Sequence, residues 1–93
     1  MSDVLDALWT TIQDRRARLP AGSYTASLFE AGLPRIAQKV GEEAVEVAVA
    51  ALSQDDSRVL AEMADLVYHA LVLLAARGLT RDQVEAELKE RFK

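Results

Sequence analysis

The sequence predicts an all-α protein, a helical bundle of the four-helix type, from three observations. Apolar residues recur at helical spacing in four segments, turn residues separate these segments, and no period-2 run is long enough to indicate a strand. A chain of 93 residues forms one domain, residues 1–93, and buries only about 60 to 70% of the surface that its unfolded form exposes. We therefore expect the protein to associate with itself as a homodimer.

The first helix is expected from Asp3 to about Arg18, because Pro20 and Gly22 follow it and end it. Residues 19–32 are expected to be a connection with one helical turn, which Gly32 stops.

Capping residues and helix-breaking residues also determine where the later helices begin and end. The second long helix begins near Pro34, which suits a first turn, and ends near Leu52. The third ends near Arg77 with Gly78 in the C′ position. A capping box at residues 80–83 starts the last helix.

Composition limits the function. The chain has no cysteine, which excludes disulfides, thiolate zinc sites and cysteine nucleophiles. Its longest uncharged stretch, residues 66–76, is much shorter than the ~20 residues of a membrane helix. A net charge of −4 with scattered basic residues does not favour a nucleic acid polymer as partner. We expect a soluble, cytoplasmic protein that binds neither nucleic acid nor membrane.

Two acidic pairs carry the functional signal. Glu43 and Glu46 are three residues apart, as are Glu62 and Asp65, so each pair shares one helix face. The 15 residues between the pairs are enough to turn the chain and bring two helices together in antiparallel contact. The pairs are therefore expected to face each other.

Both host helices are otherwise mostly apolar, which is typical of helices inside a bundle or an interface. Carboxylates gathered there repel one another unless they are protonated or neutralised. A divalent cation neutralises them, and ligands that are all oxygens favour Mg²⁺ first and Mn²⁺ second. Magnesium in such sites also takes phosphate oxygens as ligands, which indicates phosphate chemistry.

Lys39 shares a face with Glu43 and is placed to meet a phosphate oxygen. Gly41 lies inside a helix at a cost of about 1 kcal/mol relative to alanine, which the close approach of a ligand or of backbone explains. The alternative is that the carboxylates form salt bridges with Lys39, Arg35 and Arg58.

The aromatic residues near these pairs have more than one interpretation. His69 follows Asp65 by four residues and either supports a ligand, contacts substrate, or is a buried histidine hydrogen-bonded to Asp65. Tyr68 is interpreted as a core residue with a paired hydroxyl, and Trp9 as a core or interface anchor.

The arrangement Glu43-x-x-Glu46, fifteen residues, Glu62-x-x-Asp65 resembles the signature of the all-α nucleoside triphosphate pyrophosphohydrolases, the MazG-like superfamily. The flanking segments SYTA (residues 23–26), KVGEE (39–43) and ADLVYH (64–69) resemble the phosphoribosyl-ATP pyrophosphohydrolases of histidine biosynthesis. Gln38 departs from this family, which often has a basic residue there, so position 38 is given no phosphate contact.

The resemblance implies Mg²⁺-dependent hydrolysis of phosphoribosyl-ATP to phosphoribosyl-AMP and pyrophosphate by a homodimer, as the second step of histidine biosynthesis. It implies a transient contact with phosphoribosyl-AMP cyclohydrolase as well. The residues that it assigns fall into three groups. The metal ligands are Glu43, Glu46, Glu62 and Asp65; the catalytic group is Glu42, Glu43 and Glu46; the substrate contacts are Lys39, Arg35, Ser23, Tyr24, Thr25 and His69.

Two other functions fit the same residues. One is a housecleaning pyrophosphohydrolase that acts on free deoxynucleoside triphosphates. The other is a metal-free helical dimer that serves as an interaction module, in which the carboxylates form only salt bridges.

Overall fold

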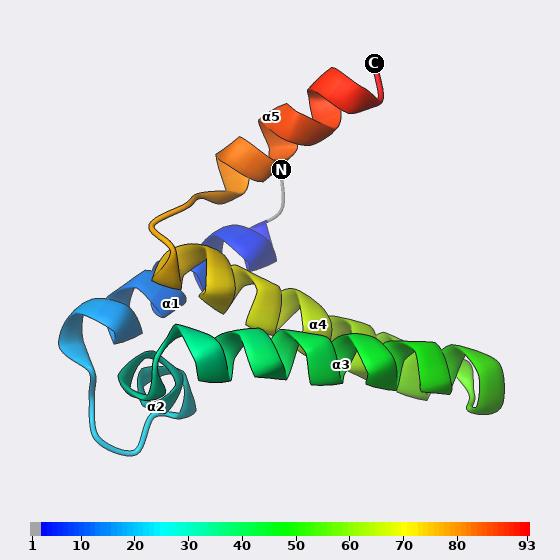
Figure 1. Ribbon diagram of the computed structural model, residues 1–93, viewed down its shortest axis with the longest axis horizontal. Coiled ribbons are helices and arrows are strands. Elements are labelled where there is room, and N and C mark those ends of the chain that lie inside the picture. Colours follow the sequence, from blue (N-terminus) through cyan, green and yellow to red (C-terminus); the bar gives the residue numbers. More distant parts are fainter. Residues whose placement is uncertain (1–2) are drawn as a thin grey trace.

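The computed structural model describes residues 3–93, and every regular element in that part of the chain is an α-helix (Figure 1). The predicted all-α class is therefore confirmed. In chain order the helices are α1 (Asp3–Arg18), α2 (Tyr24–Ala31), α3 (Leu33–Ser53), α4 (Asp56–Ala76) and α5 (Arg81–Arg91).

The connection at residues 19–32 was predicted to contain one helical turn, but it contains the eight-residue helix α2. The side chain of Ser23 caps this helix by accepting a hydrogen bond from the backbone nitrogen of Ala26 at 3.1 Å. Ala26 and Leu28 are buried, so packing stabilises a segment too short to be a stable helix alone. Gly32 ends α2 with a φ of 96°, which few residues other than glycine adopt.

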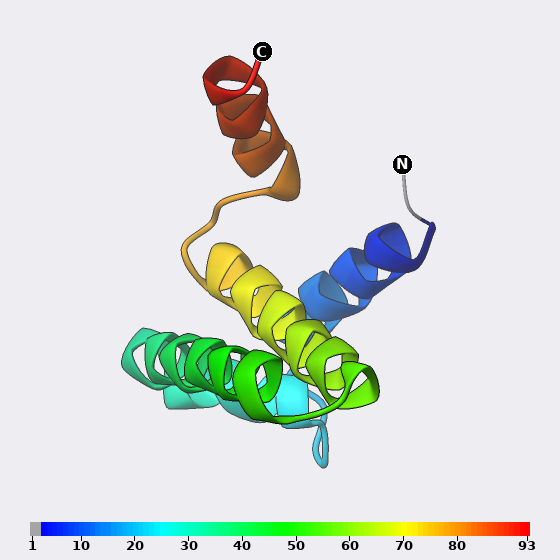
Figure 2. The same cartoon turned by 90° about the vertical axis from the view of Figure 1, so that its right-hand side faces the viewer.

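Helices α3 and α4 form an antiparallel hairpin and lie side by side over most of their length (Figures 1 and 2). The turn between them is short because Asp55 caps α4 at once, accepting from the backbone nitrogen of Arg58 at 3.0 Å. Helix α2 packs on α3, and α1 packs on α2 and α4. These four helices supply the core, whose buried members are Ile12, Leu28, Ile36, Leu71, Val72 and Ala75.

Helix α4 is long and apolar enough to cross a membrane, judged by length and composition alone. Within the protein it packs against α1 and α3 and carries the buried polar residues Glu62 and His69. Packing in the bundle accounts for part of its apolar character, since Leu71, Val72 and Ala75 face the core, whereas Leu60, Met63 and Val67 are exposed.

The end of α4 is a Schellman motif, as the expected position of Gly78 indicates. The Leu79 nitrogen donates to the Leu74 carbonyl at 2.8 Å, the Gly78 nitrogen donates to the Ala75 carbonyl at 3.0 Å, and Gly78 has a φ of 71°. The predicted capping box then starts α5, with Thr80 as the N-cap. Helix α5 points away from the other helices (Figures 1 and 2).

The capping box makes α5 a sensitive test of the fold. In Thr80→Ala we expect the helix to lose about 1 kcal/mol, which accelerates amide exchange in α5 about fivefold. The melting temperature of the bundle should barely change, because α5 packs only lightly on the other helices. Thr10→Ala, at an exposed position inside α1, is the control, and equal exchange rates in the two variants would contradict the assignment.

Candidate metal and substrate site

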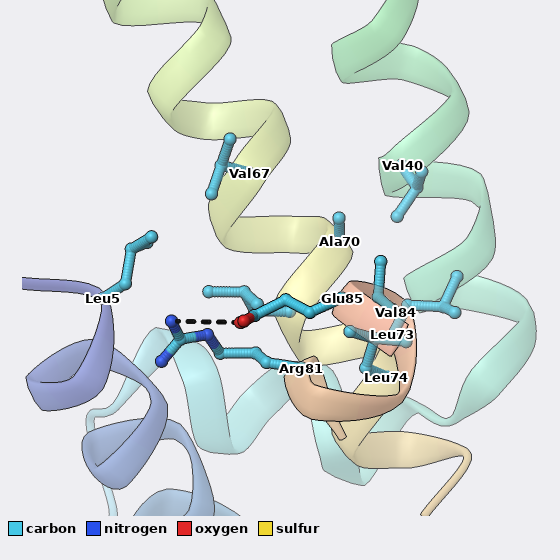
Figure 3. A pocket seen from close by; sticks show the side chains of 10 residues that line it. Leu5, Val40, Val67, Ala70, Leu73, Leu74, Arg81, Val84 and Glu85 are labelled. Carbon is cyan, nitrogen blue, oxygen red and sulfur yellow. Dashed lines mark ion pairs between the residues drawn. The ribbon is translucent and has the colours of Figure 1, made fainter. Parts of the chain in front are cut away.

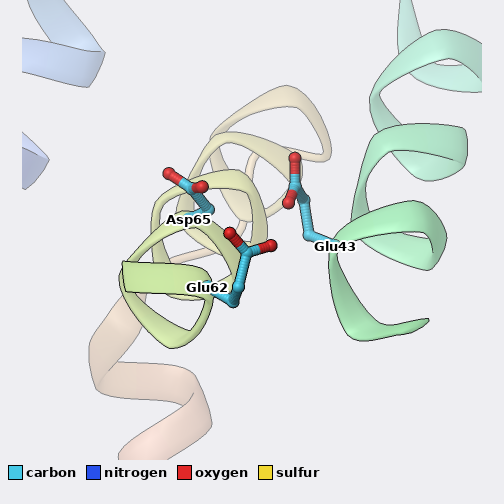
Figure 4. Close-up of side chains that lie close together, drawn as sticks. All are labelled: Glu43, Glu62 and Asp65. Carbon is cyan, nitrogen blue, oxygen red and sulfur yellow. The ribbon is translucent and has the colours of Figure 1, made fainter. Parts of the chain in front are cut away.

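Three carboxylates meet across the α3–α4 hairpin. Glu43 of α3 points toward Glu62 and Asp65 of α4, and one oxygen from each lies within 4.8 Å of the others (Figure 4). Glu43 and Glu62 are buried, with 6% and 7% of their surface exposed, whereas Asp65 opens to solvent. The prediction that the two acidic pairs face each other is confirmed for these three residues.

Glu43 has a buried oxygen without a partner. Its Oε1 lies 3.5 Å from Lys39 Nζ, but its Oε2 is inaccessible to solvent and, with Glu46 ionised, has no hydrogen-bond donor among residues 3–93. A buried, unpaired carboxylate oxygen costs free energy unless a ligand supplies what the protein does not. Its neighbours Glu62 and Asp65 are negatively charged, so the fitting ligand is a cation.

Glu46 lies one helical turn beyond Glu43 and is exposed. When Glu46 is protonated it donates a hydrogen bond to Glu43, and this bond lowers the pKa of Glu43, although burial acts in the opposite direction. The same bond and the charge of Glu43 raise the pKa of Glu46, and burial and the charge of Glu62 add to the rise. Of the two carboxylates, Glu46 therefore binds a proton more readily than Glu43.

The salt-bridge alternative is correct for part of the cluster. Arg58 Nη2 lies 2.8 Å from Glu62 Oε1, and Lys39 contacts Glu43. In the part of the chain that the structure describes, the side chains of Glu46 and Asp65 have no cationic partner within 4 Å. The four carboxylates of the two acidic pairs therefore have only Lys39 and Arg58 as cationic partners. The surplus negative charge suits a divalent ion. Because every donor is an oxygen, the site fits Mg²⁺ or Mn²⁺.

Lys39 stands at the edge of this cluster with 20% of its side chain exposed. Burial by itself lowers the pKa of Lys39, but Tyr24, Glu43 and Glu42 outweigh it, so the pKa of Lys39 is raised. The ammonium group is accordingly a permanent positive charge beside the carboxylates. It can still bind an anion from the solvent side.

Gly41 lines an open cavity of about 570 Å³ on the outer face of α3. The expectation that protein backbone approaches Gly41 is not met within residues 3–93, because a Cβ built there meets no atom within 4 Å. The space beside Gly41 leaves room for a ligand. Gln38, to which no phosphate contact was assigned, donates from Nε2 to Glu42 Oε2 at 2.9 Å and lines the same cavity.

Two hydrogen bonds join the start of α2 to α4. The Tyr24 hydroxyl lies 2.9 Å from His69 Nε2, and the Thr25 hydroxyl bonds to the Tyr68 hydroxyl. His69 is 4% exposed, and its Nδ1 lies 2.8 Å from the backbone oxygen of Asp65. The interpretation of His69 as a buried histidine bonded to Asp65 is thus confirmed, through the carbonyl rather than the carboxylate.

The structure places the other two candidates less centrally. Arg35 is exposed on α3, one turn before Lys39, and forms no ion pair within residues 3–93. It does contribute to lowering the pKa of Glu42, after the larger effect of the Gln38 hydrogen bond. Ser23 uses its hydroxyl oxygen to cap α2 and keeps its hydroxyl proton for another acceptor.

Comparison with known proteins identifies the family of the chain. A family model described as phosphoribosyl-ATP pyrophosphohydrolase matches residues 5–92. The phosphoribosyl-ATP pyrophosphatase of Metallosphaera sedula is 54% identical over 93 residues, which is 100% of both chains. The protein of the same name from Sulfurisphaera tokodaii is 51% identical over 92 residues, 99% of this chain and 98% of the relative. That from Saccharolobus solfataricus is 45% identical over the same shares.

Proposed function

Because the chain belongs to the phosphoribosyl-ATP pyrophosphohydrolase family, we propose that it hydrolyses phosphoribosyl-ATP to phosphoribosyl-AMP and pyrophosphate. This reaction is the second step of histidine biosynthesis. The observation that carries the proposal is the cluster of Glu43, Glu62 and Asp65, with its buried and unpaired oxygen on Glu43. A cluster of this kind holds a cation, and a cation held by carboxylates is what a polyphosphate substrate needs.

Glu43, Glu46, Glu62 and Asp65 are the proposed ligands of Mg²⁺, with Mn²⁺ as a substitute. Bound magnesium would neutralise charge on the phosphate chain and make a water molecule more acidic. Glu42 is proposed as an additional ligand or as the base. The Gln38 hydrogen bond, followed by the charge of Lys39, lowers the pKa of Glu42 and so favours its ionised form.

The remaining residues bind the substrate. Lys39 would contact a phosphate oxygen and stabilise the charge that develops on the departing pyrophosphate. Arg35 has a free guanidinium on the same helix and would extend this contact toward the outer phosphates. The other proposed substrate residues, for phosphate or ribose, are Ser23, Tyr24, Thr25 and His69 at the junction of α2 and α4.

We propose that the protein works as a homodimer. Val45, Val49 and Leu52 form an exposed stripe along α3, and α4 has a second stripe of exposed apolar residues, Leu60, Met63 and Val67. The second stripe runs toward an apolar cleft of about 410 Å³, which Val67 lines together with Val84 of α5 (Figure 3). Surfaces this apolar are usually covered by another chain.

In Val49→Glu we expect the dimer to dissociate into monomers, because the new charge would be buried in the interface. The helical content should be kept, since Val49 is 50% exposed in the single chain. Sedimentation velocity measures the mass directly. Val4→Glu, at a position 76% exposed on α1, is the matched control, and an unchanged mass of Val49→Glu would place the interface elsewhere.

The product of the reaction is the substrate of phosphoribosyl-AMP cyclohydrolase. We therefore propose a transient contact with that enzyme, and a cytoplasmic location in which both act. Neither a membrane nor a nucleic acid polymer has a part in the proposal.

The decisive experiment incubates the purified protein with phosphoribosyl-ATP and with a panel of deoxynucleoside triphosphates, in magnesium or in chelator. Pyrophosphate and the nucleotide product are measured together. We expect magnesium-dependent conversion of phosphoribosyl-ATP alone. Turnover of the deoxynucleoside triphosphates instead would indicate the housecleaning activity. If no compound is hydrolysed, the protein is better explained as a helical interaction module.

A further inference from the structure

Tyr24, the first residue of α2, is half exposed. Its hydroxyl bonds to His69 Nε2 at 2.9 Å, and the other nitrogen of the same ring, Nδ1, lies 2.8 Å from the backbone oxygen of Asp65. Lys39 contacts Glu43. Tyr24 is thus linked to the carboxylate cluster through His69 and Asp65, and we expect a substrate bound at Lys39 and the metal ligands to extend to the Tyr24 hydroxyl.

The hydrogen bonds of His69 fix which atom carries the proton. The Asp65 oxygen that lies 2.8 Å from His69 Nδ1 is a backbone carbonyl, which only accepts. Nδ1 must therefore be the protonated nitrogen, and in a neutral ring Nε2 is then the acceptor. His69 is almost fully buried, so solvent does not compete for these atoms. It follows that Tyr24 donates its hydroxyl proton to His69.

We propose that Tyr24 selects a hydrogen-bond donor on the substrate, and that His69 is the positioning residue that imposes this polarity. With its proton committed to Nε2, the Tyr24 oxygen offers only lone pairs to a ligand. A phosphate oxygen, which is an acceptor, would be repelled. A sugar hydroxyl or a nitrogen of the base that carries hydrogen would be bound. The inference rests on the proposed function for the identity of the substrate.

The inference assigns a different hydrogen-bonding role to each residue of the segment 23–25. Ser23 accepts from the Ala26 nitrogen and keeps its own proton, so it remains a donor and suits a phosphate oxygen. Tyr24, the next residue, faces the ligand as an acceptor and suits the nucleoside part. Thr25 is bonded to Tyr68 and anchors the segment on α4. Neighbouring residues thus recognise different parts of one molecule.

The first test needs no substrate and is independent of the proposed function. His69 is the single histidine of the chain, so long-range ¹H–¹⁵N correlation spectra of the labelled protein report its tautomer without ambiguity. At about pH 8 we expect Nδ1 to carry the proton and Nε2 to be bare. A ring protonated on Nε2, alone or with Nδ1, would overturn the inference.

The second test measures the role of Tyr24 in binding. In Tyr24→Phe we expect KM for phosphoribosyl-ATP to rise about 3- to 10-fold, the value of one neutral hydrogen bond, with kcat almost unchanged. Substrate analogues that lack one sugar hydroxyl, or carry a methylated base nitrogen, identify the donor. The analogue that lacks the donor bound by Tyr24 should have a raised KM with the native protein, and its KM should not rise further with Tyr24→Phe. Additive effects for every analogue would mean that Tyr24 contacts no donor.

Two substitutions of His69 separate positioning from mere packing. Asn places an amide nitrogen near the Nδ1 position and keeps the bond to the Asp65 carbonyl, but offers Tyr24 no acceptor. Gln brings an oxygen near the Nε2 position and restores that acceptor. We expect His69→Asn to raise KM as much as Tyr24→Phe does. His69→Gln should have a KM close to that of the native protein. In the double variant, His69→Asn should not raise KM beyond the value of Tyr24→Phe alone. Additive losses would show that His69 does not act through Tyr24.

Discussion

In the Glu46→Gln variant we expect kcat to fall at least about 100-fold while the helical circular dichroism is kept. Removing a group that only hydrogen-bonds to a metal ligand lowers metal affinity or activity about 10- to 100-fold. Loss of the charge of a ligand itself should lower activity more. The variant should also lose the rise in melting temperature that Mg²⁺ gives the native protein, because a ligand stabilises only the state that binds it. Enzyme kinetics and thermal melts with magnesium or chelator measure both effects.

Without metal, the same variant should melt higher than the native protein. The hydrogen bond to Glu43 and then the charge of Glu43 raise the pKa of Glu46, so Glu46 is held in a repulsive environment that Gln relieves. Glu87→Gln, which removes a carboxylate 64% exposed on α5, is the control and should change neither the turnover nor the response to magnesium. Retained activity in Glu46→Gln would remove Glu46 from the ligand set.

The helix boundaries were predictable because local chemistry sets them. Gly78 ends α4 and Thr80 caps α5, and both assignments follow from rules that act over a few residues. Helix α2 was underestimated for the complementary reason. Its stability comes from the burial of Ala26 and Leu28 against other helices, and a run of eight residues does not display that in its own spacing.

The carboxylate cluster was predictable for a similar reason. Spacings of three residues place Glu62 and Asp65 on one face, and a short turn brings Glu43 opposite them. What the spacing does not contain is the relative rotation of the two helices. That rotation leaves Glu46 outside the closest group and buries one oxygen of Glu43 without a partner.

The pairing of Tyr24 with His69 lies beyond sequence reasoning. The two residues are separated by 45 positions and belong to α2 and α4, which meet only through the tertiary packing of the bundle. The sequence did suggest that His69 is bonded to Asp65. It did not reveal that the partner is the backbone carbonyl, and this detail fixes the tautomer and hence the direction of the Tyr24 hydrogen bond.

Replacing Lys39 with Met is expected to lower kcat/KM for phosphoribosyl-ATP about 100- to 1000-fold, the usual cost of removing one group that stabilises charge in the transition state. The acid limb of the pH profile should also move to higher pH. The hydrogen bond from Glu46 is the main cause of the lowered pKa of Glu43, and the charge of Lys39 lowers it further. Without that charge the pKa of Glu43 rises, so a higher pH is needed to ionise the ligand.

The two variants should therefore respond to magnesium in opposite ways, although both lose turnover. Glu46→Gln removes a ligand charge and weakens Mg²⁺ binding, whereas Lys39→Met removes a competing cation 3.5 Å from Glu43 and should strengthen Mg²⁺ binding once the carboxylates are ionised. Lys89→Met in the last turn of α5 is the control for loss of a lysine. Thermal melts across a magnesium titration distinguish the cases, and a weaker response to magnesium in Lys39→Met would show that Lys39 maintains the metal site rather than contacting phosphate.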